Sequence, residues 1–343
     1  MEYGAIDLHA KESQIRIVDA DGTVILDRRI ATTRARLRDV FGDRARMRIL
    51  FETGTSSEWV AQYLEGLGHE VIVADPNYSL MYGQRTRRIK TDRRDVAALA
   101  EANRLGIYRV AHRASAVQRE RRRHLRVREH LVSMRRQAIN VVRAQLRSEG
   151  LRLPSGATET FVARYTKLDL PPLLREAMAP LLTLVEALAP LLAQAERWTR
   201  QTATQDPVSR RLMTAPGVGP VIALTYQATL DDVMRFQSPG AATAYLGLVP
   251  REASSGERQR KGGITKAGPS RIRAVLVQGA WSIWRSRGSS PALHEWVHRL
   301  AQRRGRRVAI VGLARRLARI LWAMWHDGED FNPARLKQIP VAA

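Results

Sequence analysis

The chain has 343 residues, of which 44% are apolar, so it is long enough for two or three domains that each bury a core. Its 57 Lys and Arg residues outnumber its 33 Asp and Glu residues and give a formal net charge of +24. Such a charge would repel itself unless a polyanion neutralised it, which favours DNA or RNA as a partner. The absence of cysteine excludes disulfides and cysteine-ligated zinc.

Features of a secreted or membrane protein are not expected. The N-terminal stretch MEYGAIDLHAKES lacks a basic segment followed by an apolar one, and we expect no apolar run long enough to cross a bilayer. We therefore expect a cytoplasmic protein with no membrane partner.

The first hundred residues are expected to alternate strands and helices. Hydrophobic alternation and the turn at 19–22 predict an antiparallel meander of three strands, at Tyr3–His9, Gln14–Val18 and Thr23–Leu26. Further along, apolar runs and breakers predict two more strands, at Met47–Glu52 and Glu70–Ala74. Helices are predicted around Arg34–Phe41, from Ser56 or Ser57 to Leu67, and from Asp92 to Leu105, where Gly106 ends the last one.

The middle of the chain is predicted to form a long basic helical hairpin. Residues 114–149 have helical periodicity, and Arg119 to Arg152 contains eleven Arg but three Glu. A second helix is expected from Pro171 to about Arg200, so the two helices would pair as an antiparallel coiled coil that also dimerises. We predict that the arginine face binds nucleic acid through Arg121, Arg122, Arg126 and Arg128.

The last third is predicted to be mainly helical, with helices at Ile272–Trp284 and Arg303–Trp325. In TAPGVGP, Gly217 and Gly219 would let backbone N–H groups approach a phosphate, although a simple corner between two helices is about as common. The tryptophans on these two helices fall at i, i+3 spacing, which favours core packing over base stacking. The predicted domains are therefore 1–110, 111–205 and 206–343.

Two acids, Asp92 and Asp95, lie three residues apart within the basic stretch RRIKTDRRD. They have one purely structural interpretation, in which they cap the following helix and complement its dipole. The alternative joins them to Asp7, in the first strand, and Glu52, at the end of the fourth. If those strands are neighbours and the helix lies over their edge, four carboxylates would converge. Such a set binds Mg²⁺ or Mn²⁺, which clamp the attacking and leaving oxygens of a phosphodiester.

A second candidate site is the loop that contains Ser254 and Ser255. Basic residues surround the two serines, namely Arg251, Arg258, Arg260, Lys261 and Lys266. The loop is either a polar turn whose cations hold phosphates or the site of a serine nucleophile, since clustered cations stabilise the charge that builds up on phosphate.

Several segments together resemble the DEDD transposases of insertion-sequence family one hundred and ten, which are related to the Piv invertases. They are IDLHAKES, LFETGTSSEW, KTDRRD and GLVPREASSGERQRKGGITKAG. The resemblance implies an α/β RNase H-like domain of RuvC type, a long helical hairpin or coiled coil and a mainly α C-terminal transposase domain. It further implies a catalytic set of Asp7, Glu52, Asp92, Asp95 and Ser255, with Ser254 as the alternative nucleophile.

The same resemblance implies a recombinase that cuts and rejoins DNA under the guidance of a noncoding RNA. Strand exchange cuts two duplexes, so we expect a homo-oligomer, either a dimer or a tetramer. Three alternatives are a hydrolytic nuclease of the Holliday-junction type, a non-enzymatic DNA-coating protein and an actin-like ATPase. The last is disfavoured because no D-x-G-G phosphate loop occurs in the chain.

Overall fold

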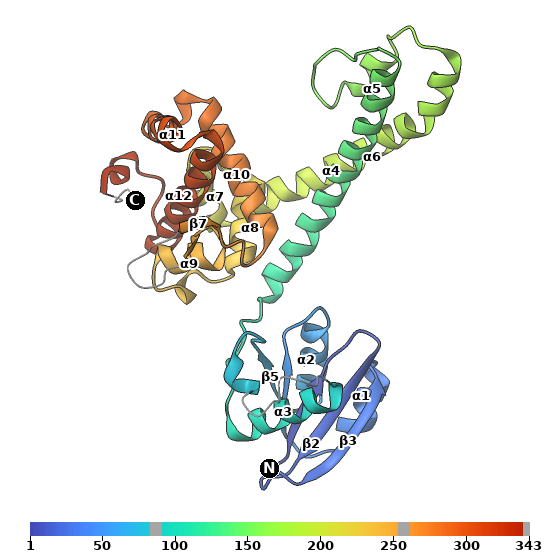
Figure 1. Cartoon of the computed structure of the whole chain (residues 1–343), viewed down its shortest axis with the longest axis vertical. Coiled ribbons are helices and arrows are strands. Elements are labelled where there is room, and N and C mark those ends of the chain that lie inside the picture. The colour runs from blue at the N-terminus through green and yellow to red at the C-terminus, as the bar shows by residue number, and fades with distance from the viewer. Residues whose placement is uncertain (83–90, 253–260, 339–343) are drawn as a thin grey trace. The chain divides into compact units, whose positions relative to one another are not determined.

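The computed structural model describes residues 1–82, 91–252 and 261–338 (Figure 1). The chain forms two compact units, Met1–Ala114 and Ser115–Ala343. Each unit is described by itself below.

The first unit is built on a five-stranded sheet with the strand order β3-β2-β1-β4-β5. The strands are β1 (Tyr3–Asp7), β2 (Glu12–Val18), β3 (Val24–Ala31), β4 (Arg48–Glu52) and β5 (Glu70–Ala74). The first three strands pair antiparallel, whereas β1 pairs with β4 and β4 with β5 in parallel. The predicted meander and the predicted neighbourhood of the first and fourth strands are thus confirmed.

Helices cover both faces of this sheet. Because side chains alternate along a strand, Ile6 packs on one face with α1 (Arg34–Phe41) and α2 (Ser57–Gly66). Its neighbour Ala5 packs on the other face with α3 (Asp92–Leu105). A short 3₁₀ turn, η1 (Ser79–Tyr82), follows β5 along the chain.

A buried asparagine fixes α3 on the sheet. Asn103 is fully buried, and its Nδ2 donates to the carbonyl oxygens of Gly4 at 2.8 Å and Arg48 at 2.9 Å. One side chain therefore links the helix to β1 and β4 at once.

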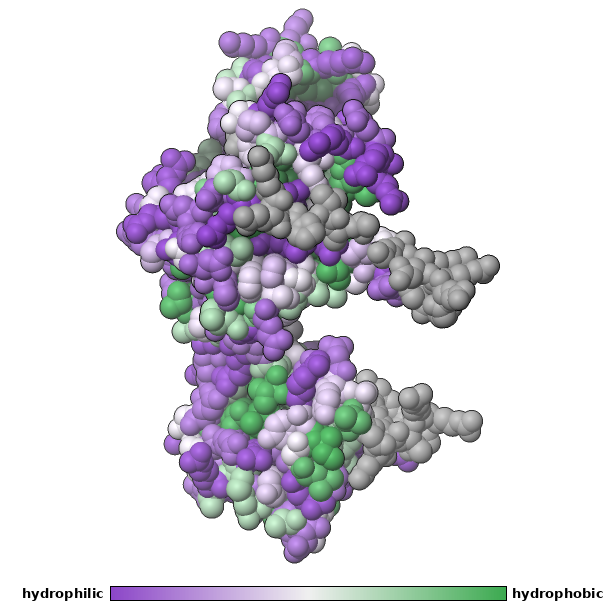
Figure 2. Space-filling model, turned by 90° about the vertical axis from the view of Figure 1, so that its left-hand side faces the viewer, coloured by the Kyte–Doolittle hydropathy of each residue, from purple (hydrophilic) through white to green (hydrophobic). Residues whose placement is uncertain are grey.

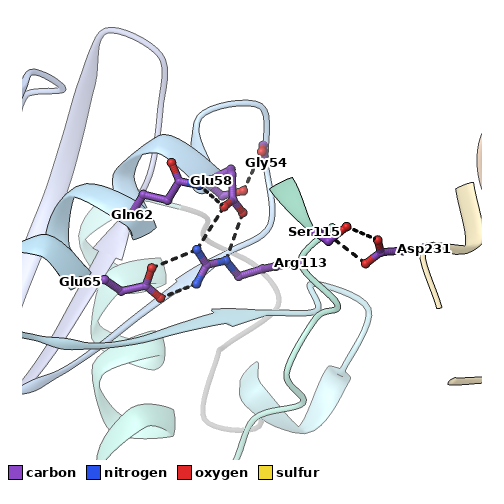
Figure 3. Close-up of polar contacts among 8 residues, drawn as sticks. Gly54, Glu58, Gln62, Glu65, Arg113, Ser115 and Asp231 are labelled. Atoms are coloured by element: carbon purple, nitrogen blue, oxygen red, sulfur yellow. Dashed lines mark hydrogen bonds and ion pairs between the residues drawn. The ribbon is translucent and has the colours of Figure 1, made fainter. Parts of the chain in front are cut away.

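The residues on either side of Ala114, where one unit ends and the next begins, each make side-chain contacts within their own unit. Arg113 lies between Glu58 and Glu65 of α2, and its Nε donates to Glu58 Oε2 at 3.1 Å (Figure 3). Hydrogen bonds from Arg113 to Glu65 and Glu58 raise the pKa of the guanidinium. Within the second unit, the Ser115 hydroxyl donates to Asp231 Oδ1 at 2.6 Å and caps the helix that follows.

The second unit begins with a helical hairpin formed by α4 (Ala116–Ser148) and α6 (Pro172–Gln205), with the short α5 (Phe161–Tyr165) near its tip (Figure 1). Val142, late in α4, shares a core with Val185, early in α6. Leu125, early in α4, packs with Ala203, near the end of α6. This pattern confirms the predicted antiparallel pairing.

Within the described part of the chain, α6 is the single helix long and apolar enough to cross a membrane, with a mean hydropathy of 1.5 in its most apolar window. The expectation that no segment reaches this length was wrong. The hairpin buries part of this apolar stripe, because Met178 and Val185 pack against α4, and 22% of the most apolar window is buried. Figure 2 shows that hydrophilic side chains cover much of the surface on the face it presents.

The rest of the second unit packs short helices around two long ones. Its elements are α7 (Pro207–Met213), α8 (Pro220–Leu230), η2 (Val233–Arg235), α9 (Pro239–Tyr245), β6 (Pro250–Glu252), β7 (Lys261–Ile264), α10 (Ser270–Arg285), η3 (Arg287–Ser289), α11 (Pro291–Arg304), α12 (Arg306–Asp327) and η4 (Pro333–Gln338). The sequence prediction missed the β6–β7 pair and α11. Gly305 separates α11 from α12 with a φ of 81°, so the predicted helix from Arg303 begins three residues later.

The paired tryptophans belong to the core of this unit, as predicted. Trp322 is buried, and Trp281, Trp284 and Trp325 pack against the same core cluster.

Candidate active site

Two of the predicted acids end neighbouring parallel strands. Ile6 of β1 lies opposite Phe51 of β4, and Asp7 and Glu52 are the next residues of these strands. The carboxyl ends of adjacent parallel strands meet at one edge of a sheet, so the strand register brings both acids there. The Asp7 side chain is 20% exposed, so solvent still reaches it.

The start of α3 supplies the other two acids. Thr91 is the N-cap, and its hydroxyl accepts a hydrogen bond from the backbone N–H of Arg94 at 3.4 Å. The interpretation of Asp92 as the N-cap was therefore wrong, because Thr91 fills that place and Asp92 is the first helical residue. Asp95 lies in the same first turn and is buried. Gly106 ends the helix in the left-handed conformation, as predicted.

Asp7, Asp92 and His9 form the tightest group at this edge. One ligand atom from each of the three side chains lies within 4.8 Å of the others. His9 Nε2 is 3.4 Å from Asp7 Oδ2. The sequence analysis did not identify His9 as a member of this group. The signal was the D-L-H stretch, which places a histidine two residues beyond the strand-ending acid.

The electrostatics of this edge favour a bound cation. Burial raises the pKa of Asp7, the nearby His9 lowers it, and the negative charges of Asp92 and Asp95 raise it further. A divalent ion bound beside Asp7 would favour its ionised form and so reverse this effect, and hard ions of this kind prefer oxygen ligands. Glu52 and Asp95 lie outside the tightest group but belong to the elements that form it.

Three of the four arginines predicted to bind nucleic acid make contacts inside the protein. Arg121, whose side chain is 12% exposed, pairs with Asp206 at 2.6 Å and donates to Gln227. Burial alone would raise the pKa of Asp206, but hydrogen bonds from Ser209, Arg121 and Gln227 lower it. This network joins α4 to α7 and α8.

The other two internal contacts hold α4 against its neighbours. Arg122 Nε donates to the carbonyl oxygen of Ala228 at 2.6 Å, and Arg128 pairs with Glu196 of α6 at 2.5 Å. Arg126 remains exposed. The exposed arginines of α4 are Arg123, Arg126, Arg136, Arg143 and Arg147.

Family models match both ends of this chain. A DEDD transposase model matches residues 5–149, and a model described as the transposase IS116/IS110/IS902 family matches residues 209–295. A probable family 20 transposase of Pseudomonas aeruginosa is 32% identical over 336 residues, which cover 96% of this chain and 98% of that protein. The chain belongs to the IS116/IS110/IS902 family of transposases.

Two further relatives match the transposase over almost the whole length of this chain. The transposase for insertion sequence element IS1111A of Coxiella burnetii is 26% identical and covers 95% of this chain and 90% of its own. The transposase for IS1328 of Yersinia enterocolitica is 28% identical, and the match covers 95% of this chain and 97% of that protein. Transposases are DNA-cutting enzymes, and a DEDD domain implies an RNase H-like fold and a divalent metal.

The serine loop of the transposase lies between β6 and β7. Ser254, Ser255, Arg258 and Arg260 lie outside the described residues. Their flanks pair antiparallel, with Glu252 opposite Lys261. Arg251 and Lys266 are exposed, and Lys266 has a φ of 56° in the left-handed region.

The glycine-rich turn of the transposase has a packing role. Gly217 has a φ of 70°, and a Cβ there would lie 2.5 Å from the carbonyl oxygen of Gly279 in α10. The residue must therefore be glycine for close approach of two backbones. Gly219 is the N-cap of α8, and a Cβ there would meet nothing within 4 Å. Space remains beside Gly219 for a phosphate contact, which stays a prediction.

Proposed function

We propose that the transposase cuts and rejoins DNA with Mg²⁺ or Mn²⁺ held by Asp7, Glu52, Asp92 and Asp95, and with Ser255 as nucleophile. The observation that carries this proposal is the approach of Asp7 and Asp92, which come from a strand and a helix 85 positions apart in the numbering, within 4.8 Å of each other. Ionised neighbours of like charge repel each other, and the positive groups nearby are Arg29, 3.9 Å from Asp92, and His9, 3.4 Å from Asp7.

The residues of the chain have distinct tasks in this proposal. The four carboxylates bind and position the divalent ion, which when bound neutralises charge on the phosphodiester. His9 lies beside Asp7 Oδ2, where it can exchange a proton with the site or add a nitrogen ligand. The raised pKa of Asp7 means that protons compete with the ion for the site as the pH falls.

The serine step conserves the energy of the phosphodiester. The Ser255 oxygen loses its proton and bonds to phosphorus, while the bond from phosphorus to the departing sugar oxygen breaks and that oxygen takes up a proton. A sugar hydroxyl then attacks the phosphoserine, releases the serine and restores a phosphodiester. Support comes from the loop's flanks, which β6 and β7 hold together, and from the neighbouring Arg251 and Lys266.

The proposed partners are DNA and a noncoding guide RNA. The exposed arginines of α4 offer charge along a long helix, which suits backbone contact with a nucleic-acid helix. We further propose a homo-oligomer, because strand exchange must hold four DNA ends, and a place in the cytoplasm. The more specific likeness to RuvC-type domains and Piv invertases belongs to the same proposal.

The decisive experiment traps the reaction on labelled DNA, denatures it and looks for label that migrates with protein. Wild type should give an adduct, Ser255→Ala should give none, and Ser254→Ala should retain it. Retention with Ser255→Ala and loss with Ser254→Ala would move the nucleophile by one residue. If wild type recombines DNA without any adduct, the covalent mechanism is refuted and a hydrolytic nuclease that uses water takes its place.

A further inference from the structure

A pocket lies in the second unit and is lined by residues of α4, of α8 and of the start of α10. Its volume is about 360 Å³. Three arginines line it, Arg122 and Arg126 from α4 and Arg271 from α10, against a single acid, Glu129, among the lining residues. The lining therefore carries a surplus of positive charge.

Two of these arginines are partly buried, and each donates to one backbone carbonyl oxygen, Arg122 to that of Ala228 and Arg271 to that of Leu125. Burial lowers the pKa of Arg122. Burial also lowers the pKa of Arg271, Glu129 at 3.1 Å raises it, and the charges of Arg128 and Arg126 lower it again. Within the described part of the chain, the buried Nε of Arg271 has no hydrogen-bond partner. A bound anion would offset the burial of both guanidinium groups.

A buried hydroxyl in the pocket also lacks a partner. Thr225 is 3% exposed, lines the pocket, and its Oγ1 makes no hydrogen bond to any described residue. Thr229, one turn further along α8, differs because its hydroxyl donates to the Thr225 carbonyl oxygen at 2.7 Å. An unsatisfied buried hydroxyl is unfavourable, so its position at this pocket points to a ligand.

The third wall of the pocket is the beginning of a long helix. Pro269 and Ser270 line the pocket, and α10 extends over 16 residues without a side-chain cap. The first N–H groups of a helix have no partner within it, and the helix dipole places partial positive charge there. Helix N-termini of this kind bind phosphate oxygens.

From this combination we propose that the pocket binds one phosphate group through Arg126, Arg271, the Thr225 hydroxyl and the start of α10. The phosphate belongs either to a nucleic-acid backbone or to a small phosphate compound, and the test below separates the two. The proposal goes beyond the metal and serine chemistry and does not depend on it. Its residues belong to neither site, so its failure would leave the adduct experiment unaffected.

The variant that tests the proposal most specifically is Thr225→Val, which keeps the shape of the side chain and removes its hydroxyl. Because no described residue forms a hydrogen bond with this hydroxyl, thermal stability should hold or rise. Affinity for inorganic phosphate should fall about three- to tenfold, as expected for one lost hydrogen bond. The control is Thr243→Val, a fully buried threonine whose hydroxyl donates to the Pro239 carbonyl oxygen at 3.0 Å. It should lower stability and leave phosphate affinity unchanged.

A second pair of variants tests the charge. Arg126→Gln and Arg123→Gln remove the same charge from exposed positions on one helix, but Arg123 does not line the pocket. Arg126→Gln should weaken phosphate binding about tenfold, and Arg123→Gln should not.

The probes are inorganic phosphate by titration calorimetry at constant ionic strength, and a DNA duplex and a structured RNA by fluorescence anisotropy. If a variant loses affinity for both phosphate and nucleic acid, the proposal is supported and the bound phosphate belongs to the nucleic-acid backbone. If a variant loses affinity for phosphate but keeps its affinity for nucleic acid, the proposal is supported and the natural ligand is a small phosphate compound. If neither Thr225→Val nor Arg126→Gln weakens the binding of inorganic phosphate more than its control does, the proposal is refuted.

Discussion

Replacement of Asn103 by leucine tests how the acidic edge is assembled. Asn103 connects α3 to β1 and β4, the three elements that carry the acids. Leucine has a similar shape but removes both hydrogen bonds, to the carbonyl oxygens of Gly4 and Arg48. Each bond contributes about 1 kcal/mol, and each buried carbonyl left without a donor adds to the loss.

The net magnitude follows from one further observation. The Oδ1 of Asn103 is buried and has no hydrogen-bond partner among the described residues, so its removal offsets part of the loss. We expect the first unit to lose about 2 kcal/mol, the value of two neutral hydrogen bonds. Asn103→Asp should be worse, because a carboxylate would face the two carbonyl oxygens without any proton to donate.

Hydrogen exchange followed by mass spectrometry is the suitable assay, because it reports on peptides of each unit separately and a chain of two compact units is not expected to unfold in one step. A loss of about 2 kcal/mol corresponds to roughly thirtyfold faster exchange in β1, β4 and α3. Asn140→Leu, at an exposed position of α4, is the control and should change nothing. Unchanged exchange in β1 and β4 of Asn103→Leu would refute the assignment of Asn103 as the link.

Other predictions follow from single contacts. Burial and neighbouring acids raise the pKa of Asp7, so its ionised form destabilises the metal-free first unit above that pKa, and stability should increase as the pH falls through it. Asp7→Asn should abolish this pH dependence in thermal melts, and a dependence that persists would point to another group. Thr91→Ala should cost the start of α3 about 1 kcal/mol, seen as faster exchange there, whereas Thr91→Ser should not. Arg121→Gln should destabilise the second unit by about 3 kcal/mol because it leaves Asp206 without its partner. Arg126→Gln should instead leave stability intact and reduce the slope of log K against log salt by about one, and an unchanged slope would exclude a phosphate contact.

Local signals in the sequence predicted much of the fold. The helices α1 and α3 lie at the predicted residues, and Gly106 ends α3 as predicted, whereas their threonine caps, Thr33 and Thr91, were not predicted. The strand β3 runs five residues beyond its predicted end at Leu26. Its extension contains Asp27, Arg28 and Arg29, and an edge strand such as β3 tolerates charges that a central strand would not.

What the sequence could not predict depends on contacts between distant residues. Arg121 and Arg126 look alike in the helical pattern. Arg121 nevertheless forms an ion pair inside the protein with Asp206, 85 positions later in the numbering, whereas Arg126 is exposed. The same limit hid His9, whose closeness to Asp92 depends on where α3 lies on the sheet. The shared edge of Asp7 and Glu52 could be predicted because strand order follows from topology rules, whereas the family resemblance pointed to all four acids.

Binding of Mn²⁺ by the acidic edge tests the central claim most directly. Electron paramagnetic resonance can count the bound ion in titrations of the full chain, with and without nucleic acid. Wild type should bind Mn²⁺, and Asp7→Asn and Asp92→Asn should each weaken binding at least about tenfold, the effect expected for a lost charged ligand. Asp39→Asn, which removes an exposed carboxylate of α1, is the control and should bind as wild type does. Equal binding by wild type, Asp7→Asn and Asp92→Asn would show that these carboxylates hold no metal and contradict the account.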